Sequence, residues 1–190
     1  TLVSEFMLQQ TQVATVIPYF NKFIEKIPNF KILAKVQNKK LLKLWEGLGY
    51  YSRARNLKKT AQMVVKNFNG KLPDNFDDLI SLPGIGVYTA SAILSIAFNK
   101  PYIPLDGNIE RVLKRYLYLK KKSEIQKENL VKKKTVFGFT KRSSDYAQAL
   151  MELGALICKP LNPLCNQCPI SKKCKSLRKK DFEITKNIKK

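Results

Sequence analysis

Apolar residues recur at helical spacing along most of this sequence, and this periodicity decides which folds the chain can adopt. One such series consists of Val3, Phe6, Met7, Val13, Val16, Ile17 and Phe20. Steps of three and four residues place these side chains on one face of an α-helix. Alternating runs typical of strands are scarce, and prolines and glycines divide the first two thirds of the chain into short segments. The sequence therefore predicts an all-α fold built from short helices.

The chain is strongly basic. Its 190 residues include 36 Lys or Arg against 14 Asp or Glu, which gives a formal net charge of +22. Such a surplus favours a polyanionic partner such as nucleic acid. A compositional bias of the source genome toward lysine would also produce it. Of two Lys-rich segments, 172–190 is interpreted as a tail and 120–142 as a solvated connection, with a phosphate-contacting face as the alternative for the latter.

No window of the sequence approaches the roughly 20 apolar residues that a membrane-spanning helix needs. The first residues also lack the basic region and apolar run of a secretory signal. We therefore expect an intracellular protein without membrane association, cytoplasmic and nucleoid-associated if the source is bacterial. The sequence begins with Thr1 inside a helical pattern, so we also expect it to be a fragment of a longer chain.

All four cysteines lie in one short segment that also contains prolines. They are Cys158, Cys165, Cys168 and Cys174, so the gaps between them are six, two and five residues. Disulfides suit small secreted scaffolds, and this chain shows no secretion signal. Four thiolates that meet at one centre suit both zinc and iron–sulfur clusters. The spacing predicts a four-thiolate metal centre and leaves the choice of metal open.

Residues 82–94, LPGIGVYTASAIL, place two glycines two positions apart directly before a run of small and apolar residues. Glycines allow the backbone angles of a tight turn, and the start of the following helix directs N–H groups toward an anion. The preceding NFDDLISL predicts a first helix that starts near Asp74 or Asn75. The segment is interpreted as a helix-hairpin-helix that binds DNA backbone without reading sequence. An ordinary helix–helix turn is the alternative.

The LPGIG hairpin, the aspartate in PLDGN and the cysteine gaps together resemble the helix-hairpin-helix base-excision DNA glycosylases that carry an iron–sulfur cluster. Endonuclease III and the MutY-type adenine glycosylases are two branches of this family. The segments VSEFMLQQTQVATVIPYF, LWEGLGYYSRARNL and YAQALMELGALIC are similar to the adenine glycosylase branch, and the likeness spans about residues 2–174. It implies an all-α, two-lobed helix-hairpin-helix fold with a [4Fe-4S] cluster loop held by the four cysteines.

The resemblance also implies how the chain is divided. Residues 1–100 would form a helical lobe that contains the helix-hairpin-helix at about 74–96, and residues 101–176 would form the iron–sulfur cluster lobe. Residues 177–190 would be a basic tail or linker toward a further C-terminal domain. In this family that domain is related to Nudix hydrolases and reads 8-oxoguanine.

Removal of adenine from deoxyribose needs one group that donates a proton to the base and another that stabilises positive charge on the sugar. Because the chain has no histidine, two carboxylates are the natural pair. The resemblance assigns the proton donor to Glu5, which lies among apolar residues, and the stabilising or attacking carboxylate to Asp106. Without the resemblance, Glu5 would be a solvated helix residue and Asp106 a helix N-cap.

Tyr88 bears on the choice between the two branches. In glycosylases that also cut the DNA backbone, a lysine at this place attacks the sugar to form a Schiff base. This chain reads GVYTA, so the amine is missing and a monofunctional glycosylase is predicted. The resemblance implies that Tyr88 assists at the transition state, and a stacked surface aromatic is the alternative.

The target adenine must be flipped out of the duplex, so side chains must fill the space that it leaves. The DNA-binding residues implied by the resemblance are Gln10, Tyr50, Gly84, Ile85, Gly86 and Asn108, with Gln148 facing the adenine pocket. Gln10 and Tyr50 match inserted side chains, with Tyr50 beside the opposing damaged guanine; a core position is the alternative for Tyr50. The three hairpin residues would offer N–H groups to phosphate.

These interpretations predict a base-excision repair enzyme, an adenine DNA glycosylase that acts as a monomer on double-stranded DNA. It would hydrolyse the N-glycosidic bond of adenine mispaired with 8-oxoguanine or guanine. One alternative is an endonuclease III-like glycosylase and lyase for oxidised pyrimidines. Another is a non-catalytic DNA-binding module.

Overall fold

The secondary structure is helical. A computed structural model describes residues 1–120 and 141–182, and these residues form helices and no strand. The all-α prediction is confirmed for them, and none of their helices combines the length and the apolar character that a bilayer crossing requires. The chain divides into two compact units, Thr1–Ile93 and Leu94–Lys190. Most of the Lys-rich segment 120–142 and residues 183–190 of the predicted tail lie outside the described residues.

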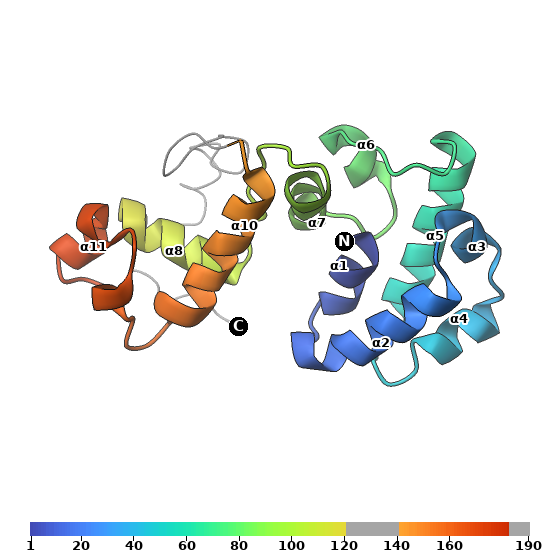
Figure 1. The fold of residues 1–190 in the computed structure, drawn as a ribbon, viewed down its shortest axis with the longest axis horizontal. Coiled ribbons are helices and arrows are strands. Elements are labelled where there is room, and N and C mark those ends of the chain that lie inside the picture. Colours follow the sequence, from blue (N-terminus) through green and yellow to red (C-terminus); the bar gives the residue numbers. More distant parts are fainter. Residues whose placement is uncertain (121–140, 183–190) are drawn as a thin grey trace. The chain divides into compact units, whose positions relative to one another are not determined.

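Helix α1 contacts three other helices of the first unit. The helices of this unit are α1 (Leu2–Leu8), α2 (Val13–Lys26), α3 (Phe30–Lys35), α4 (Asn38–Leu44), α5 (Ser52–Asn67), α6 (Phe76–Ser81) and α7 (Val87–Ala92). α1 contacts α2, α5 and α7, and α3 packs along α5 (Figure 1). A π-helix, Ile93–Ala97, follows α7 directly. The packing around α1 buries most of its short length.

Aromatic side chains form the centre of the core of this unit. Phe6, Phe23 and Trp45 are completely buried. The rings of Phe23 and Trp45 meet edge to face, with centroids 6.0 Å apart and planes at 82°, which is a favourable geometry for aromatic rings. The apolar series that predicts the first helices therefore includes true core residues. Val13 and Ile17 are exceptions in that series, because both are exposed.

The predicted helix-hairpin-helix is present as α6, the turn that follows it and α7. Asn75 is the N-cap of α6, and its side chain accepts a main-chain N–H at 2.9 Å. Gly84 in the turn has a φ of +80°, and a Cβ there would lie 2.8 Å from Cε1 of Phe6. Thr60 on α5 donates to the main-chain oxygen of Pro83 at 2.8 Å. The hairpin is thus held against α1 and α5, and glycine fits at its closest approach.

The second unit is organised around α8. Its described helices are α8 (Gly107–Leu117), α10 (Ser143–Glu152), a π-helix (Leu153–Ile157), short 3-10 helices at Cys165–Gln167 and Ser171–Lys173, and α11 (Lys175–Arg178). α8 packs against α10, the π-helix and α11. A buried apolar cluster connects α8 with α10 and with the segment before α8, and consists of Ile103, Ile109, Val112, Leu113 and Leu150. α8 therefore connects the segment that carries Asp106 with the segment that carries the cysteines.

Candidate active site

Glu5 is a buried carboxylic acid. It lies on α1 with 7% of its surface exposed, next to Phe6 and Met7, which are completely buried. Glutamate is rarely buried to this degree unless its carboxyl has a partner. Tyr88 is half-buried near the start of α7, the helix that contacts α1 (Figure 1). The structure therefore places these two predicted residues on contacting helices of one unit.

Asp106 is the N-cap of α8 in the second unit. Its Oδ1 accepts the main-chain N–H of Ile109 at 2.7 Å, and its Oδ2 accepts from Nδ2 of Asn108 at 3.4 Å. Partial burial raises the pKa of Asp106, while the hydrogen bonds from Ile109 and Asn108 oppose this rise because they favour the charged form. The N-cap that the sequence suggested is therefore present, with a polar side chain beside its second oxygen.

Arg111 extends this contact toward the cysteines. Its side chain is buried, and Nη2 donates to Oδ1 of Asn108 at 2.8 Å and to the main-chain oxygen of Gly154 at 2.7 Å. Nε donates to the main-chain oxygen of Cys158 at 2.7 Å. A continuous path of hydrogen bonds thus runs from the Asp106 carboxylate to the main chain of Cys158.

Arg115 lies one turn further along α8 and binds the loop that begins at Cys158 and carries the cysteines. Nη1 donates to the main-chain oxygen of Lys159 at 2.6 Å, and Nη2 donates to that of Pro160 at 2.8 Å. Nη1 also lies 3.6 Å from Sγ of Cys158, within reach of a weak hydrogen bond to sulfur. With Arg111, two buried arginines on adjacent turns therefore bind three successive main-chain oxygens of the loop.

All four cysteines line one small cavity. It has a volume of about 30 Å³, and Arg115 also lines it. Each cysteine is a half-buried free thiol. Burial raises the pKa of the Cys165 thiol, the neighbouring Cys158, Cys174 and Cys168 raise it further, and Arg115 lowers it. In the part of the chain that the structure describes, no group of three or more His, Cys, Asp or Glu side chains is arranged to hold a metal ion, although the four thiols share one cavity.

Gln10 and Tyr50 are exposed on two loops of the first unit. Tyr50 has 60% of its surface exposed, so it is not a core residue. The φ angles of Gln10 and Tyr50 are +58° and +45°, in the left-handed region that residues other than glycine rarely adopt. Both side chains therefore stand on loops with an unusual backbone.

The main-chain N–H of Ile85 makes a hydrogen bond within the hairpin. The N–H of Ile85 donates to the main-chain oxygen of Leu82 at 3.2 Å, so it is engaged within the turn. Gly86 is the N-cap of α7.

Gln148 is exposed on α10, and its Nε2 donates to Oγ and the main-chain oxygen of Ser144 at 3.1 and 3.3 Å. In this structure the amide of Gln148 is bonded to its own helix.

Sequence patterns did not indicate three buried arginines, Arg53, Arg111 and Arg115. Each donates to main-chain oxygens of other segments. Arginine suits this task because its planar guanidinium carries five donors and can bind several oxygens at once. Lysine supplies most of the positive charge of this chain. Because arginine is rare in this Lys-rich chain, an arginine is a candidate for a position where a guanidinium is needed. This signal could have drawn attention to the three residues from the sequence.

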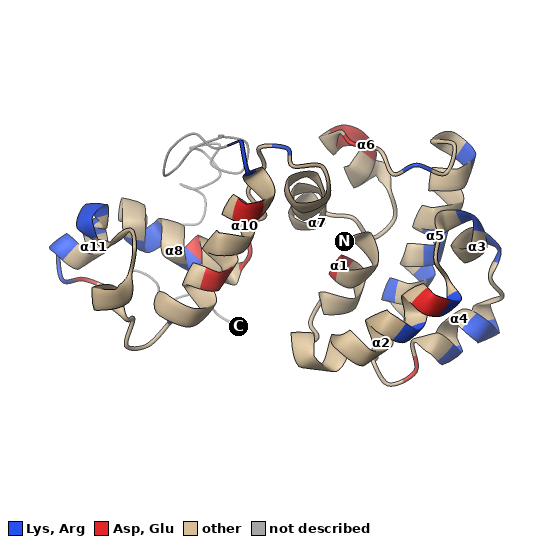
Figure 2. Ribbon diagram, viewed as in Figure 1, with Lys and Arg blue, Asp and Glu red and all other residues tan. Residues whose placement is uncertain are grey.

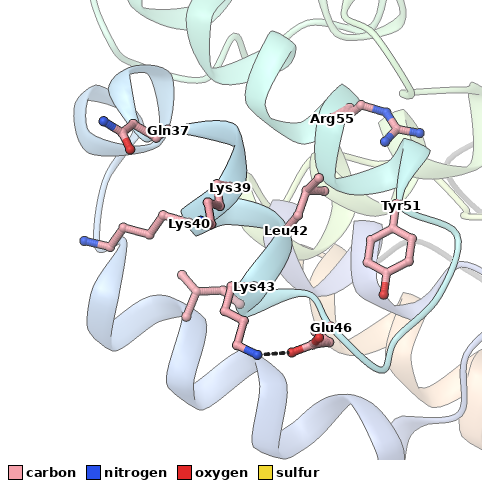
Figure 3. A pocket seen from close by; sticks show the side chains of 9 residues that line it. Gln37, Lys39, Lys40, Leu42, Lys43, Glu46, Tyr51 and Arg55 are labelled. Atoms are coloured by element: carbon pink, nitrogen blue, oxygen red, sulfur yellow. Dashed lines mark hydrogen bonds and ion pairs between the residues drawn. The ribbon is translucent and has the colours of Figure 1, made fainter.

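A larger cavity, of about 800 Å³, lies on α4 and the start of α5. Its lining consists of Gln37, Lys39, Lys40, Leu42, Lys43, Leu44, Glu46, Tyr51 and Arg55 (Figure 3). Lys43 faces Glu46 there and pairs with it at 2.6 Å. Further basic residues lie on the neighbouring α3 and α5 (Figure 2). Because the lining contains none of the predicted site residues, this cavity is not a candidate adenine pocket.

Comparisons with known sequences point to one group of proteins. Residues 3–135 match the family model described as "HhH-GPD superfamily base excision DNA repair protein". The chain is 48% identical over 187 residues to adenine DNA glycosylase of Buchnera aphidicola subsp. Baizongia pistaciae, covering 97% of this chain and 53% of that protein. It is 42% identical over 188 residues to the Homo sapiens adenine DNA glycosylase, covering 95% and 34% respectively. The chain thus spans about half the length of its bacterial relative, and less of the human one.

Solved structures give the same result at the level of the fold. A thermostable thymine-DNA glycosylase is similar with a TM-score of 0.83 and 30% identity, covering 94% of this chain and 83% of that one. A non-covalent endonuclease III–DNA complex is similar with a TM-score of 0.75 and 27% identity, again covering 94% and 83%. These likenesses confirm the helix-hairpin-helix glycosylase fold that the sequence predicts.

Proposed function

The chain belongs to the HhH-GPD superfamily of base excision DNA repair proteins, and on this basis we propose that it acts as an adenine DNA glycosylase. Its substrate is adenine mispaired with 8-oxoguanine or guanine in double-stranded DNA, on which it acts as a monomer. Relatives named adenine DNA glycosylase support this, because they are 48% and 42% identical over nearly all of this chain. The burial of Glu5 is the structural observation that carries the proposal, since the reaction needs a positioned proton donor.

Glu5 and Asp106 divide the chemistry between them. Glu5 donates its proton to the adenine ring while the C–N glycosidic bond breaks, so the bonding electrons leave with a neutral base. The sugar is left with positive charge, which ionised Asp106 stabilises or attacks. Water then adds to the same carbon, displaces Asp106 where a bond to it has formed, and gives its proton to the Glu5 carboxylate. The hydrogen bond from the N–H of Ile109 favours the charged form of Asp106, which suits this role.

Tyr88 supports a monofunctional enzyme. A lyase step needs an amine that attacks the sugar and forms a Schiff base. Tyr88 presents a phenol where the resemblance places a lysine in the lyase branch. The DNA strand therefore stays intact after the base is released. The phenol assists the reaction near Glu5, and the contact between α7 and α1 supports this role.

The four cysteines hold a [4Fe-4S] cluster in this proposal. Their chemistry fits, because four free thiols line one cavity and the guanidinium of Arg115 lies beside Sγ of Cys158. A bound cluster would cross-link the loop through thiolate–iron bonds. Arg111 and Arg115 hold the main chain of the loop on α8, the helix that begins after Asp106.

DNA contacts come from several loops. Gln10 and Tyr50 fill the space left by the flipped adenine, and their exposure supports this role. The hairpin residues Gly84, Ile85 and Gly86 contact phosphate, Asn108 contacts DNA beside Asp106, and Gln148 turns from Ser144 toward the adenine. Since its substrate is DNA, the protein works inside the cell, at the nucleoid if the source is bacterial.

A labelled duplex with one adenine opposite 8-oxoguanine tests the proposal. The full-length protein is incubated with this duplex, and the products are separated with and without hot alkali. Strand breakage that appears only after alkali supports base removal without lyase action. Breakage without alkali, once contaminating nucleases are excluded, supports the endonuclease III-like alternative, whose structure this chain also resembles. No release of adenine would contradict the proposal and favour a non-catalytic DNA-binding module.

Glu5→Gln tests the assigned proton donor, because it keeps the size of the side chain and removes its acidic proton. Adenine release is expected to fall by a factor of about 10²–10⁴, with DNA binding retained. Glu25→Gln is the matched control, since Glu25 is an exposed residue of α2 that pairs with Lys26. It is expected to leave the rate unchanged. A Glu5→Gln protein with the wild-type rate would exclude Glu5 as the acid.

A further inference from the structure

Gln10 and Tyr50 are two of the three exposed residues of the first unit, other than glycine, that have a positive φ; the third is Asn69. Gln10 and Tyr50 have φ angles of +58° and +45°. Glycine adopts this left-handed region without strain, whereas other residues are strained there. A backbone in this region persists only when surrounding contacts hold it there. The two residues stand on separate loops, one after α1 and one before α5. A support common to both must therefore reach two segments that are distant in sequence.

Arg53 reaches the loop after α1. Its side chain is 5% exposed, near the start of α5. Nη1 donates to the main-chain oxygen of Met7 at 2.6 Å and also to that of Gln9. On the other side of Gln10, it donates to Oγ1 of Thr11 at 3.1 Å. The guanidinium thus holds the residues on both sides of Gln10.

The same side chain also holds the loop before α5. Nη2 donates to the main-chain oxygens of Leu48 at 3.0 Å and Gly49 at 3.3 Å. Cζ of Arg53 lies 5.4 Å from the centroid of the Tyr50 ring, within range of a cation–π interaction. The main-chain N–H of Arg53 donates to the oxygen of Tyr50 at 2.9 Å. Arg53 therefore binds both the main chain beside Tyr50 and the ring of Tyr50 itself.

The guanidinium group is well suited to this set of contacts. It is rigid and planar, and its five donors point in several directions, whereas the ammonium of lysine has three donors at one point. Its charge also lies at the C-terminal end of α1, where main-chain oxygens lack helical partners and favour a cation. Because the site is buried, breaking the contacts leaves main-chain oxygens without donors.

We propose that Arg53 is a positioning residue that holds Gln10 and Tyr50 as a preformed pair for insertion into the DNA stack. The inference rests on the proposed function, because insertion serves to replace a flipped base. Loops that are already ordered lose little conformational freedom on binding, so more of the binding energy remains to separate the bases. Without the guanidinium of Arg53, the loops that carry Gln10 and Tyr50 relax toward ordinary φ angles, and base flipping becomes slower.

Arg53→Lys tests this with two substrates in the full-length protein. One substrate has adenine paired opposite 8-oxoguanine, and the other has an adenine that is already extrahelical in a one-nucleotide bulge. Single-turnover rates at saturating enzyme are expected to fall about tenfold or more on the paired substrate, and less than about threefold on the bulged one. Arg55→Lys is the matched control, since Arg55 is exposed on the same helix, and it leaves both rates unchanged.

Thr11→Val is a milder second variant, because it removes one hydroxyl acceptor from the contacts of Arg53 and keeps the size of the side chain. It is expected to slow reaction on the paired substrate by about two- to threefold and to leave the bulged substrate unaffected. The fluorescence of 2-aminopurine beside the target adenine reports unstacking without any need for catalysis. Both variants are expected to give a smaller fluorescence increase than wild type at saturating protein.

Equal rate losses on the two substrates would mean that Arg53 only stabilises the fold, and would overturn the proposal. Wild-type rates together with wild-type unstacking would overturn it too. If Arg53→Lys does not fold, the same comparisons with Thr11→Val decide. A wild-type protein that releases no adenine from either substrate contradicts the proposed function instead, and the fluorescence comparison still decides whether Arg53 prepares the two loops.

Discussion

Arg111 donates from Nε to the main-chain oxygen of Cys158 at 2.7 Å, and so joins the helix that begins after Asp106 to the first cysteine of the loop. The same guanidinium donates to Asn108, whose amide reaches the Asp106 carboxylate. Such bonds are costly to break where water does not reach the freed groups. The cysteine loop and the N-terminus of α8 are therefore held by one side chain.

Replacing this arginine is expected to destabilise the protein. Arg111→Met keeps an apolar stem but leaves the buried main-chain oxygen of Gly154 and the partly buried one of Cys158 without their donor, so the free energy of unfolding should fall by about 2–4 kcal/mol. Urea unfolding followed by circular dichroism measures this change. Arg178→Met, at an exposed position of α11, is the control and should stay within about 0.5 kcal/mol of wild type. A loss as small as in the control would mean that water replaces the donor.

Substitutions of Asp106 separate its structural role from its chemical one. Asparagine caps helices as well as aspartate, so Asp106→Asn can still accept the N–H of Ile109 and should unfold within about 0.5 kcal/mol of wild type. Adenine release should nevertheless fall at least about a hundredfold, because the charge is lost. Asp106→Ala should cost about 1 kcal/mol of stability as well. Thermal unfolding and single-turnover assays check both, and an active Asn variant would refute the role of the charge.

The pKa of Asp106 predicts how stability changes in acid. Burial raises this pKa above its ordinary value of 3.8, and hydrogen bonds only partly offset the rise. A carboxyl with a raised folded-state pKa stabilises the fold fully below its unfolded-state pKa, and this contribution is lost as the pH rises through the folded-state pKa. Wild type should therefore gain stability relative to Asp106→Asn as the pH falls through that window. Unfolding midpoints of the two proteins between neutral pH and 3.8 check this, and a constant difference would contradict the raised pKa.

The two hairpin glycines are expected to differ in their tolerance of a side chain. At Gly84, φ is +80° and a Cβ would lie 2.8 Å from the ring of Phe6, so Gly84→Ala should cost about 2–4 kcal/mol. At Gly86, φ is −98° and a Cβ would meet open space. Gly86→Ala should therefore change the free energy of unfolding by less than about 1 kcal/mol. Chemical denaturation compares the pair, and equal losses would mean that the ring of Phe6 moves aside.

The cysteines are expected to bind iron. The purified protein should be brown, absorb toward the blue end of the visible spectrum and contain about four iron atoms per chain. Cys168→Ser should lose this iron, whereas Ser171→Ala, which changes another residue that lines the same cavity, should keep it. Elemental analysis for iron and zinc measures both. A colourless protein with one zinc ion per chain would refute the cluster.

Several features of the site could be predicted because their signals are local. Asn75 begins α6 within the predicted range, since an N-cap accepts an N–H only three residues away. Asp106 caps α8 for the same reason. The four cysteines share a cavity because short gaps leave the chain little freedom to separate them. The roles of Glu5, Tyr88 and the DNA-contacting residues, and the lobe boundaries at about 100 and 176, stay predictions.

The helices, the hairpin and the grouping of the thiols follow from local features of the sequence, because periodicity, caps and spacing act over a few residues. Which charged and polar side chains are buried depends instead on how the helices pack against one another. From its sequence context alone, Glu5 is predicted to be a solvated helix residue, but it is buried because α2, α5 and α7 pack around α1. No local pattern in the sequence distinguishes Arg53 and Arg111 from the other arginines. Their roles appear only because the fold brings main-chain oxygens from distant segments to their guanidinium groups. Burial and long-range hydrogen bonds depend on these contacts, and no short stretch of sequence contains them.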